Sequence, residues 1–126
     1  MKENIKLIAA FSGAVLSRFL GGFDGMVYTL LAFVIFDYIT GVSIAITEKK
    51  LSSAVGFKGI FRKVLIFAMV GVGNMIDLYI LKGGTVIRSA VIFFYIANEG
   101  ISLTENAAKL GLPIPEKLKS VFEQIK

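Results

Sequence analysis

Long apolar runs, separated by short glycine-rich or basic stretches, dominate the pattern of this chain. Four such runs can be marked out, at residues 4–20, 26–46, 64–81 and 86–103. A helix rises about 1.5 Å per residue, so each run approaches the roughly 20 residues that cross about 30 Å of hydrocarbon. The pattern predicts an all-α integral membrane protein, a bundle of three to four transmembrane helices forming a single membrane domain over residues 1–126.

The runs differ in how strongly they favour insertion. The run at 26–46 holds eleven Leu, Ile, Phe or Val residues, worth on the order of −3 to −7 kcal/mol against about +2.5 to +3.5 for its one aspartate. The run at 4–20 holds only eight, with Lys6 and Arg18 near its ends. It either crosses the membrane or lies in the interface. A secretory signal is a third interpretation, although no clean A-x-A cleavage site follows.

A polar tail, residues 104–126, follows the last apolar run and is expected in the cytoplasm. Prolines mark a turn, and a short helix is predicted at about 115–125. Its apolar positions are spaced three and four apart, on one amphipathic stripe: Leu118, Val121, Phe122 and Ile125. We expect a surface helix packed on the membrane or on its own bundle, with a partner-binding helix as the alternative.

Composition supports the membrane interpretation and argues against an enzyme. Hydrophobic residues make up 56% of the chain and its mean hydropathy is +0.77, too apolar for a soluble core of 126 residues. Cysteine and histidine are both absent, which removes thiolate nucleophiles, the usual zinc ligands and the commonest general base. No catalytic, cofactor-binding or metal site is predicted, and no cofactor.

The net charge of +5 is explained by topology rather than by nucleic-acid binding. Five basic residues lie in the loop at 47–63. With that loop inside, a four-span chain keeps eleven basic residues in the cytoplasm and leaves Arg18, Lys82 and Arg88 outside. This bias predicts a cytoplasmic C-terminus and N-terminus. With three spans the N-terminus would lie outside.

Asp37 is the only charged residue of the run at 26–46. Gly41 and Ala45 follow at four and eight positions, with Thr40 beside them, so the acid shares a face with residues that permit close helix contact. No cation of the chain is expected at its depth. We therefore expect Asp37 to stay neutral or to draw water inward until chains associate.

Further polar residues fall within the last two runs. The fourth run carries a polar side made of Tyr95, Asn98, Glu99, Ser102, Glu105 and Asn106. The third run contributes Asn74, and Asp77 is expected to form a structural pair with Arg88 across the "KGGT" turn.

Three interpretations of the other intramembrane groups stay open. In the first, they hydrogen-bond to one another and stabilise the bundle of a single chain. In the second, they help chains associate and then face water in a lesion, and in the third they bind a transported substrate.

Several motifs together carry a family resemblance over about residues 20 to 120. They are "DYITG" at 37–41, "KKLSSAVGFKGIFRK" at 49–63, "IDLYIL" in the third run and "FFYIANEGISLTENAAKLGLPIPEKLK" at 93–119. Together they resemble the toxin secretion/phage lysis holins of phages and prophages of low-GC Gram-positive bacteria. The motif in the fourth run is the most specific of these.

The resemblance implies a multi-pass protein of the bacterial cytoplasmic membrane that forms homo-oligomers in the lipid bilayer. It would open lesions that release an endolysin, lysing the host cell, or a toxin, without required direct contact; an antiholin is a further possible partner. The motif positions carried over are Asp37, Thr40, Gly41, Ser52, Ser53, Gly56, Gly59, Asp77, Asn98, Glu99, Glu105 and Asn106.

The loop motif admits two interpretations. Ser52 and Ser53 are potential helix caps, and Gly56 and Gly59 indicate either a turn that feeds a basic interfacial segment or a gating hinge.

Two other functions remain as alternatives to a holin. A small membrane transporter or channel subunit would need a defined substrate site and often an internal repeat, which is not evident here. An antiholin would share the fold and inhibit.

Overall fold

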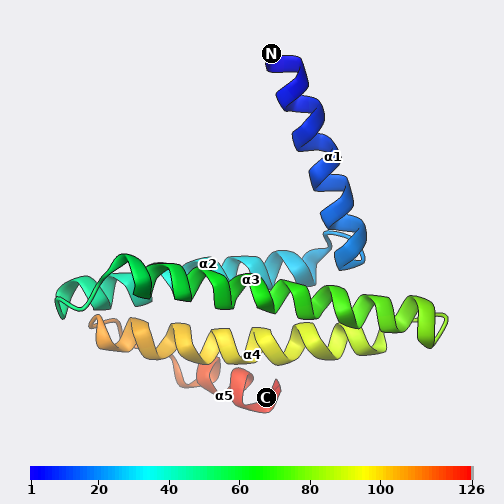
Figure 1. The fold of residues 1–126 in the computed structure, drawn as a ribbon. Helices are drawn as coiled ribbons and strands as arrows, with labels where there is room; N and C mark the ends of the chain where they lie inside the picture. Colours follow the sequence, from blue (N-terminus) through cyan, green and yellow to red (C-terminus); the bar gives the residue numbers. More distant parts are fainter. Residues whose placement is uncertain (126) are drawn as a thin grey trace.

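The computed structural model describes residues 1–125, and these fold into helices joined by short turns (Figure 1). Residue 126, the end of the expected tail, lies outside the described residues. The helices are α1 (Lys2–Leu20), α2 (Gly25–Thr47), α3 (Ser53–Met75), the π-helical η1 (Ile76–Ile80) that continues α3, α4 (Val86–Lys109) and α5 (Glu116–Ile125). The predicted all-α class is confirmed.

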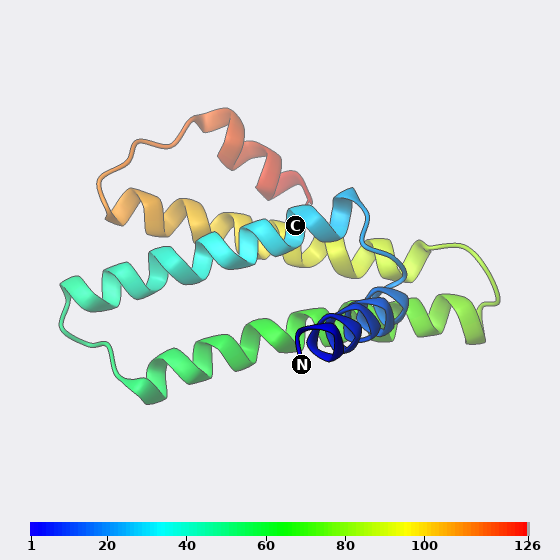
Figure 2. The same ribbon diagram turned by 90° about the horizontal axis from the view of Figure 1, so that it is seen from above.

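The central feature is a bundle of α2, α3 with η1, and α4, in which α3 runs antiparallel to the other two (Figures 1 and 2). The core is formed by aliphatic side chains from all three helices: Val27, Leu30, Val34, Ile66, Val70, Ile92 and Ile96. α4 packs on both α2 and α3. α1 projects away from the bundle, and α5 returns along α4 (Figures 1 and 2).

Large apolar side chains also cover much of the outside of the bundle. Phe36, Phe61 and Phe94 are each at least half exposed. Within residues 1–125, three helical stretches are long and apolar enough to cross a membrane: Gly25–Thr47, Ser53–Ile80 and Val86–Lys109. An apolar exterior on helices of this length is what a multi-pass membrane protein requires.

Two helix ends differ from the expected ranges. The third helix begins at Ser53 rather than at residue 64, because the Ser52 hydroxyl accepts a hydrogen bond from the Val55 N–H (3.2 Å) and caps it there. The fourth continues to Lys109 rather than ending at residue 103. In both cases the helix extends through polar residues, since helix length follows caps and packing as well as hydropathy.

The C-terminal helix packs on its own bundle, one of the two positions expected for it. Phe122 is its buried residue. The Phe122 ring meets Phe33 of α2 edge to face at 5.7 Å between centroids. A Cβ on Gly100 of α4 would fall 2.6 Å from the same ring, so the glycine makes room for it.

Candidate functional site

Three ionisable side chains, one from each bundle helix, meet inside the bundle. They are Asp37 of α2, Lys63 of α3 and Glu99 of α4. The Lys63 ammonium donates to Asp37 Oδ2 and to the two Glu99 carboxylate oxygens at 2.8 and 2.7 Å. The Asp37 and Glu99 side chains are only 6% and 8% exposed. One cation therefore holds two buried carboxylates together across three helices.

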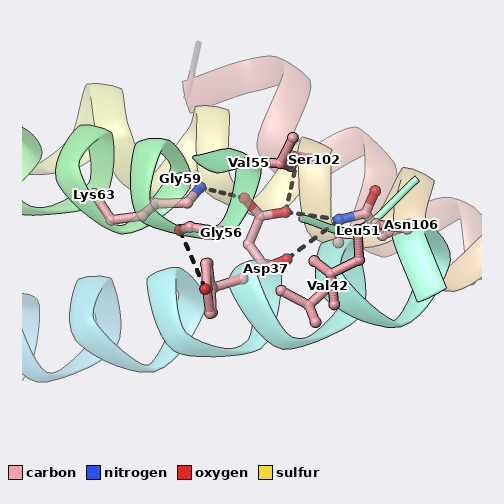
Figure 3. Close-up of a pocket in the computed structure, with 12 residues that line it drawn as sticks. Asp37, Val42, Leu51, Val55, Gly56, Gly59, Lys63, Ser102 and Asn106 are labelled. Carbon is pink, nitrogen blue, oxygen red and sulfur yellow. Dashed lines mark hydrogen bonds and ion pairs between the residues drawn. The ribbon is translucent and has the colours of Figure 1, made fainter. Parts of the chain in front are cut away.

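Neutral polar groups also donate hydrogen bonds to Asp37 (Figure 3). Ser102 Oγ donates to Asp37 Oδ1 at 2.7 Å, and Asn106 Nδ2 donates to the same oxygen at 3.0 Å. Asn106 also donates to Thr40 Oγ1 at 3.1 Å. We call these residues together the Asp37 cluster: Asp37, Thr40, Lys63, Glu99, Ser102 and Asn106.

The expectation that no cation of the chain lies near Asp37 is wrong. It rested on assigning Lys63 to a basic loop, whereas α3 begins at Ser53 and carries this lysine ten residues, about 15 Å, into the helix. Gly56 and Gly59 precede Lys63 by seven and four positions, so they share its face. Ser52 as a cap and this spacing are the sequence signals that could have placed Lys63 inside.

The Asp37 cluster lies between two cavities. One, of about 250 Å³, opens between α2 and α3 beside Gly41 and Asn106 (Figure 3). The other, of about 700 Å³, is lined by Tyr95 and Asn98 of α4 among others. The residues lining both cavities are Asp37, Gly59, Lys63 and Ser102. The charged groups of the cluster therefore separate two cavities, each of which is large enough to hold water.

The glycines of the loop motif lie inside α3 and not in a turn, which corrects that expectation. Both face Tyr38 of α2. The Tyr38 hydroxyl donates to the Gly56 carbonyl oxygen at 3.3 Å, and a Cβ on Gly59 would lie 3.3 Å from the Tyr38 ring. Their role here is to let an aromatic ring approach the α3 backbone.

A second buried polar cluster lies toward the other end of the bundle and changes the expected Asp77–Arg88 pair. The Asp77 carboxylate accepts from the backbone N–H groups of Ile87 (3.0 Å) and Arg88 (2.9 Å), at the start of α4. The Arg88 guanidinium instead donates to Asp24 Oδ2 at 2.8 Å. The charge pair expected with Asp77 is therefore wrong, because the Arg88 side chain is directed to the turn between α1 and α2.

Asp24 makes two interactions in that turn, one with the start of α2 and one with Arg88. Its carboxylate caps α2 by accepting from the Val27 N–H at 3.0 Å. The hydrogen bond from the Arg88 guanidinium lowers the pKa of the Asp24 carboxyl below its ordinary value. Sequence reasoning missed Asp24, although an aspartate directly before an apolar run is a common helix-start signal.

The remaining residues predicted from the sequence lie in different parts of the structure. Asn74 belongs to the second cluster, where it donates to the Phe19 carbonyl oxygen at 3.1 Å. Glu105 is exposed and lines a hollow beside Lys119 and Glu123 of α5. The structure thus brings Asp37, Thr40, Glu99, Ser102 and Asn106 together, but it separates Asn74 from them. Every buried side-chain nitrogen or oxygen of residues 1–125 has a hydrogen-bond partner.

Comparison with known proteins identifies the family. A family model described as the bacteriophage holin family matches residues 14–126. The chain belongs to the bacteriophage holin family. The resemblance seen in the sequence motifs is confirmed, and the holin match takes in all three bundle helices and α5.

Relatives of this holin-family chain occur in phages and bacteria. A protein named "Probable holin" from Bacillus phage phi105 is 45% identical over 68% of this chain and 63% of its own length. A Clostridium perfringens protein of unassigned function is 40% identical over 96% of this chain and 90% of its own. A Listeria innocua protein, also without assigned function, is 43% identical over 87% and 78%. No solved structure matches.

Proposed function

We propose that this protein is a holin that oligomerises in the bacterial cytoplasmic membrane, with its C-terminus in the cytoplasm, and opens lesions there. An endolysin or a toxin would pass through these lesions without binding the holin. Membership of the holin family and similarity to the phage phi105 relative support the class of function. The observation that carries the mechanism is Lys63 held between Asp37 and Glu99 inside three helices of membrane-spanning length.

A network of charges in hydrocarbon is stable in two states only: with every charge paired, or with every charge in contact with water. While the helices stay packed, Lys63 satisfies both carboxylates and the bundle is closed. If the helices separate, the three charges lose their partners in a medium that solvates them poorly, and the free energy falls only when water reaches them. The Asp37 cluster would therefore hold an isolated chain shut and, once association of many chains pulls the helices apart, favour a water-filled opening.

Inducible expression in bacteria tests the proposal. Growth should stop and the membrane potential should collapse after a delay, and cells that also make an endolysin should then lyse. High expression with intact potential and trapped endolysin would contradict a holin. An antiholin would instead delay lysis by a second, co-expressed holin, and a transporter subunit would do neither.

Asp37→Asn tests the role of the Asp37 cluster in timing. The amide keeps the shape but loses the charge that binds Lys63, so opening should cost less and the delay should shorten. Ser43→Ala is a matched control on the same helix, because its hydroxyl bonds only to the helix backbone, at the Ile39 carbonyl. Equal delays for Asp37→Asn and the control at equal membrane levels would show that the cluster does not set the timing.

A further inference from the structure

The C-terminal end of α1 is held by buried side chains of the bundle. A helix leaves its last carbonyl groups without partners of its own. Here Asn74 Nδ2 donates to the carbonyl oxygens of Phe19 (3.1 Å) and Arg18 (3.4 Å). Arg88 Nε donates to the Leu20 carbonyl, and its Nη2 to that of Gly22 at 3.0 Å. A cation at this position also complements the negative end of the helix dipole.

The same junction leaves little room for α1 to swing. Gly21 has φ +84°, and a Cβ there would lie 2.5 Å from Asn74 Oδ1. The ring of Phe19 lies directly over Gly71 of α3, where a Cβ would come within 1.9 Å of it. Because side chains of α3 and α4 fill this junction, the direction of α1 is set by packing and not by a free linker.

This fixed direction carries α1 sideways from the bundle, with its N-terminal end leaning toward the middle of the bundle's length (Figures 1 and 2). Asn74 lies six residues, about 9 Å, before the end of η1, and Arg88 is the third residue of α4. The root of α1 is therefore near the end of the bundle that bears the turn at 81–85. The opposite turn contains Lys49 and Lys50, which favour the cytoplasm. With three helices across the bilayer, α1 would leave the bundle in its outer half.

The two faces of α1 suit that position. Ile8, Phe11 and Val15 fall on the same side as Phe19, whereas Lys2 and Lys6 lie opposite. Phe19 contacts Gly71, which is three residues, about 4.5 Å, nearer the middle of α3 than Asn74. The apolar face thus looks toward the centre of the bilayer. Ile8 and Phe11 are 65% and 72% exposed, so the protein itself leaves this face uncovered.

We propose that α1 is an interfacial arm rather than a fourth crossing. It lies at the outer boundary between headgroups and acyl chains, with its apolar face in lipid and its lysines toward headgroups and water. Asn74 and Arg88 are the positioning residues that hold its root. The occupant of the exposed face is lipid, because the α3 surface beside the junction also exposes apolar side chains, at Val72 and Met75. This inference places the N-terminus outside, and it does not depend on lesion formation.

Single-cysteine labelling tests the placement, since the chain has no cysteine of its own. Cells making Lys2→Cys, Thr85→Cys or Lys50→Cys chains are treated with a membrane-impermeant maleimide before growth slows. Lys2→Cys should label at the rate of the outer control, Thr85→Cys, while the inner control, Lys50→Cys, stays unlabelled until the cells are permeabilised. Protection of Lys2→Cys together with the inner control would mean that α1 crosses the membrane, and would overturn the proposal.

Fluorescence quenching tests the lipid contact itself. The full chain, carrying a polarity-sensitive fluorophore at Phe11→Cys or Lys6→Cys, is reconstituted in phosphatidylglycerol and phosphatidylethanolamine vesicles. Brominated acyl chains should quench the Phe11→Cys probe at least about twofold more than the Lys6→Cys probe, and iodide should do the reverse. Equal quenching, or efficient Phe11→Cys cross-linking between two chains, would show that lipid does not cover this face.

Discussion

At the level of single residues, Lys63 is the cation that pairs with both buried carboxylates of the Asp37 cluster. Its ammonium bridges two carboxylates that are only 6% and 8% exposed among apolar helices. A buried ion pair adds little over a well-packed apolar core, yet removing one partner leaves a charge that the surroundings cannot solvate. The Asp37 cluster should therefore be sensitive to single changes and tolerant of changes that remove all the charge at once.

Lys63→Met should lower the free energy of unfolding by about 3 to 5 kcal/mol, because it strands Asp37 and Glu99. Adding Asp37→Asn and Glu99→Gln to the same chain should restore most of that loss. Thermal unfolding in detergent, followed by circular dichroism, measures both. Lys58→Met is the control, since Lys58 is an exposed lysine of the same helix. A triple variant no more stable than Lys63→Met alone would refute the charge explanation.

Asp24 should make the stability of the folded chain depend on pH, with less stability at low pH. Its pKa is lowered in the folded chain from the ordinary 3.8 by the Arg88 hydrogen bond. A group of this kind stabilises the fold above its unfolded pKa and loses that contribution as the pH falls through the folded value. The side chain is 47% exposed, so the contribution is under about 1 kcal/mol.

The matching measurement compares the wild-type chain with Asp24→Asn, which can still cap α2. The wild-type chain should unfold at a higher temperature at pH 7, and the difference should shrink toward pH 3. A difference that stays constant over this range would mean that the Asp24 charge contributes nothing.

Sequence reasoning located most of the Asp37 cluster but not its cation. Glu99, Ser102 and Asn106 follow one another by three and four positions, so helical spacing alone puts them on one face. Lys63 was missed because a lysine bordering an apolar run is ordinarily assigned to the membrane surface. Its place depends on where α3 begins, which the Ser52 cap decides.

At the level of helices, α5 is attached to the bundle chiefly through one buried side chain, Phe122. Phe122 fits over Gly100 and against Phe33, while the rest of α5 is largely exposed. The short helix was predictable from its amphipathic stripe, with Phe122 on it. The surface that this helix covers was not predictable from the sequence. The space above Gly100 that receives the Phe122 ring is formed only once α4 and α5 pack together.

Phe122→Ala should free α5 from the bundle and speed protease cleavage in the turn around Pro113 and Pro115 about fivefold or more, because a detached segment is cut from its open state. Gly100→Ala should act in the same direction, since its methyl group would meet the Phe122 ring at 2.6 Å. Gly13→Ala is the control, because a Cβ there meets nothing within 4 Å. Cleavage at the wild-type rate in both variants would mean that α5 is held by other contacts.

At the level of the whole molecule, the bundle is apolar outside and charged within. Sequence alone predicted an all-α membrane bundle, because runs of this length and hydropathy have few other solutions. It left the number of crossings open, since α1 is intermediate in hydropathy. The sideways course of α1 depends on Asn74 and Arg88, which are more than 50 residues away along the chain.

The proposed oligomer predicts a change in cross-linking with time. A lysine-reactive cross-linker applied to membranes should give dimers and larger species that increase as growth arrest approaches, because lesions require many chains. Asp37→Asn should shift this increase earlier along with the arrest. A chain that stays monomeric through the arrest would exclude lesions built from self-association.

The Asp77 carboxylate also bears on how the chain enters the membrane. Thr85 makes no capping hydrogen bond with its side chain, and two N–H groups of the first turn of α4 are satisfied by Asp77 on η1 instead. In hydrocarbon, N–H groups without partners cost several kcal/mol. These two N–H groups of α4 thus find their partner on η1, and we expect α3, η1 and α4 to enter the bilayer more favourably as a hairpin than α4 does alone.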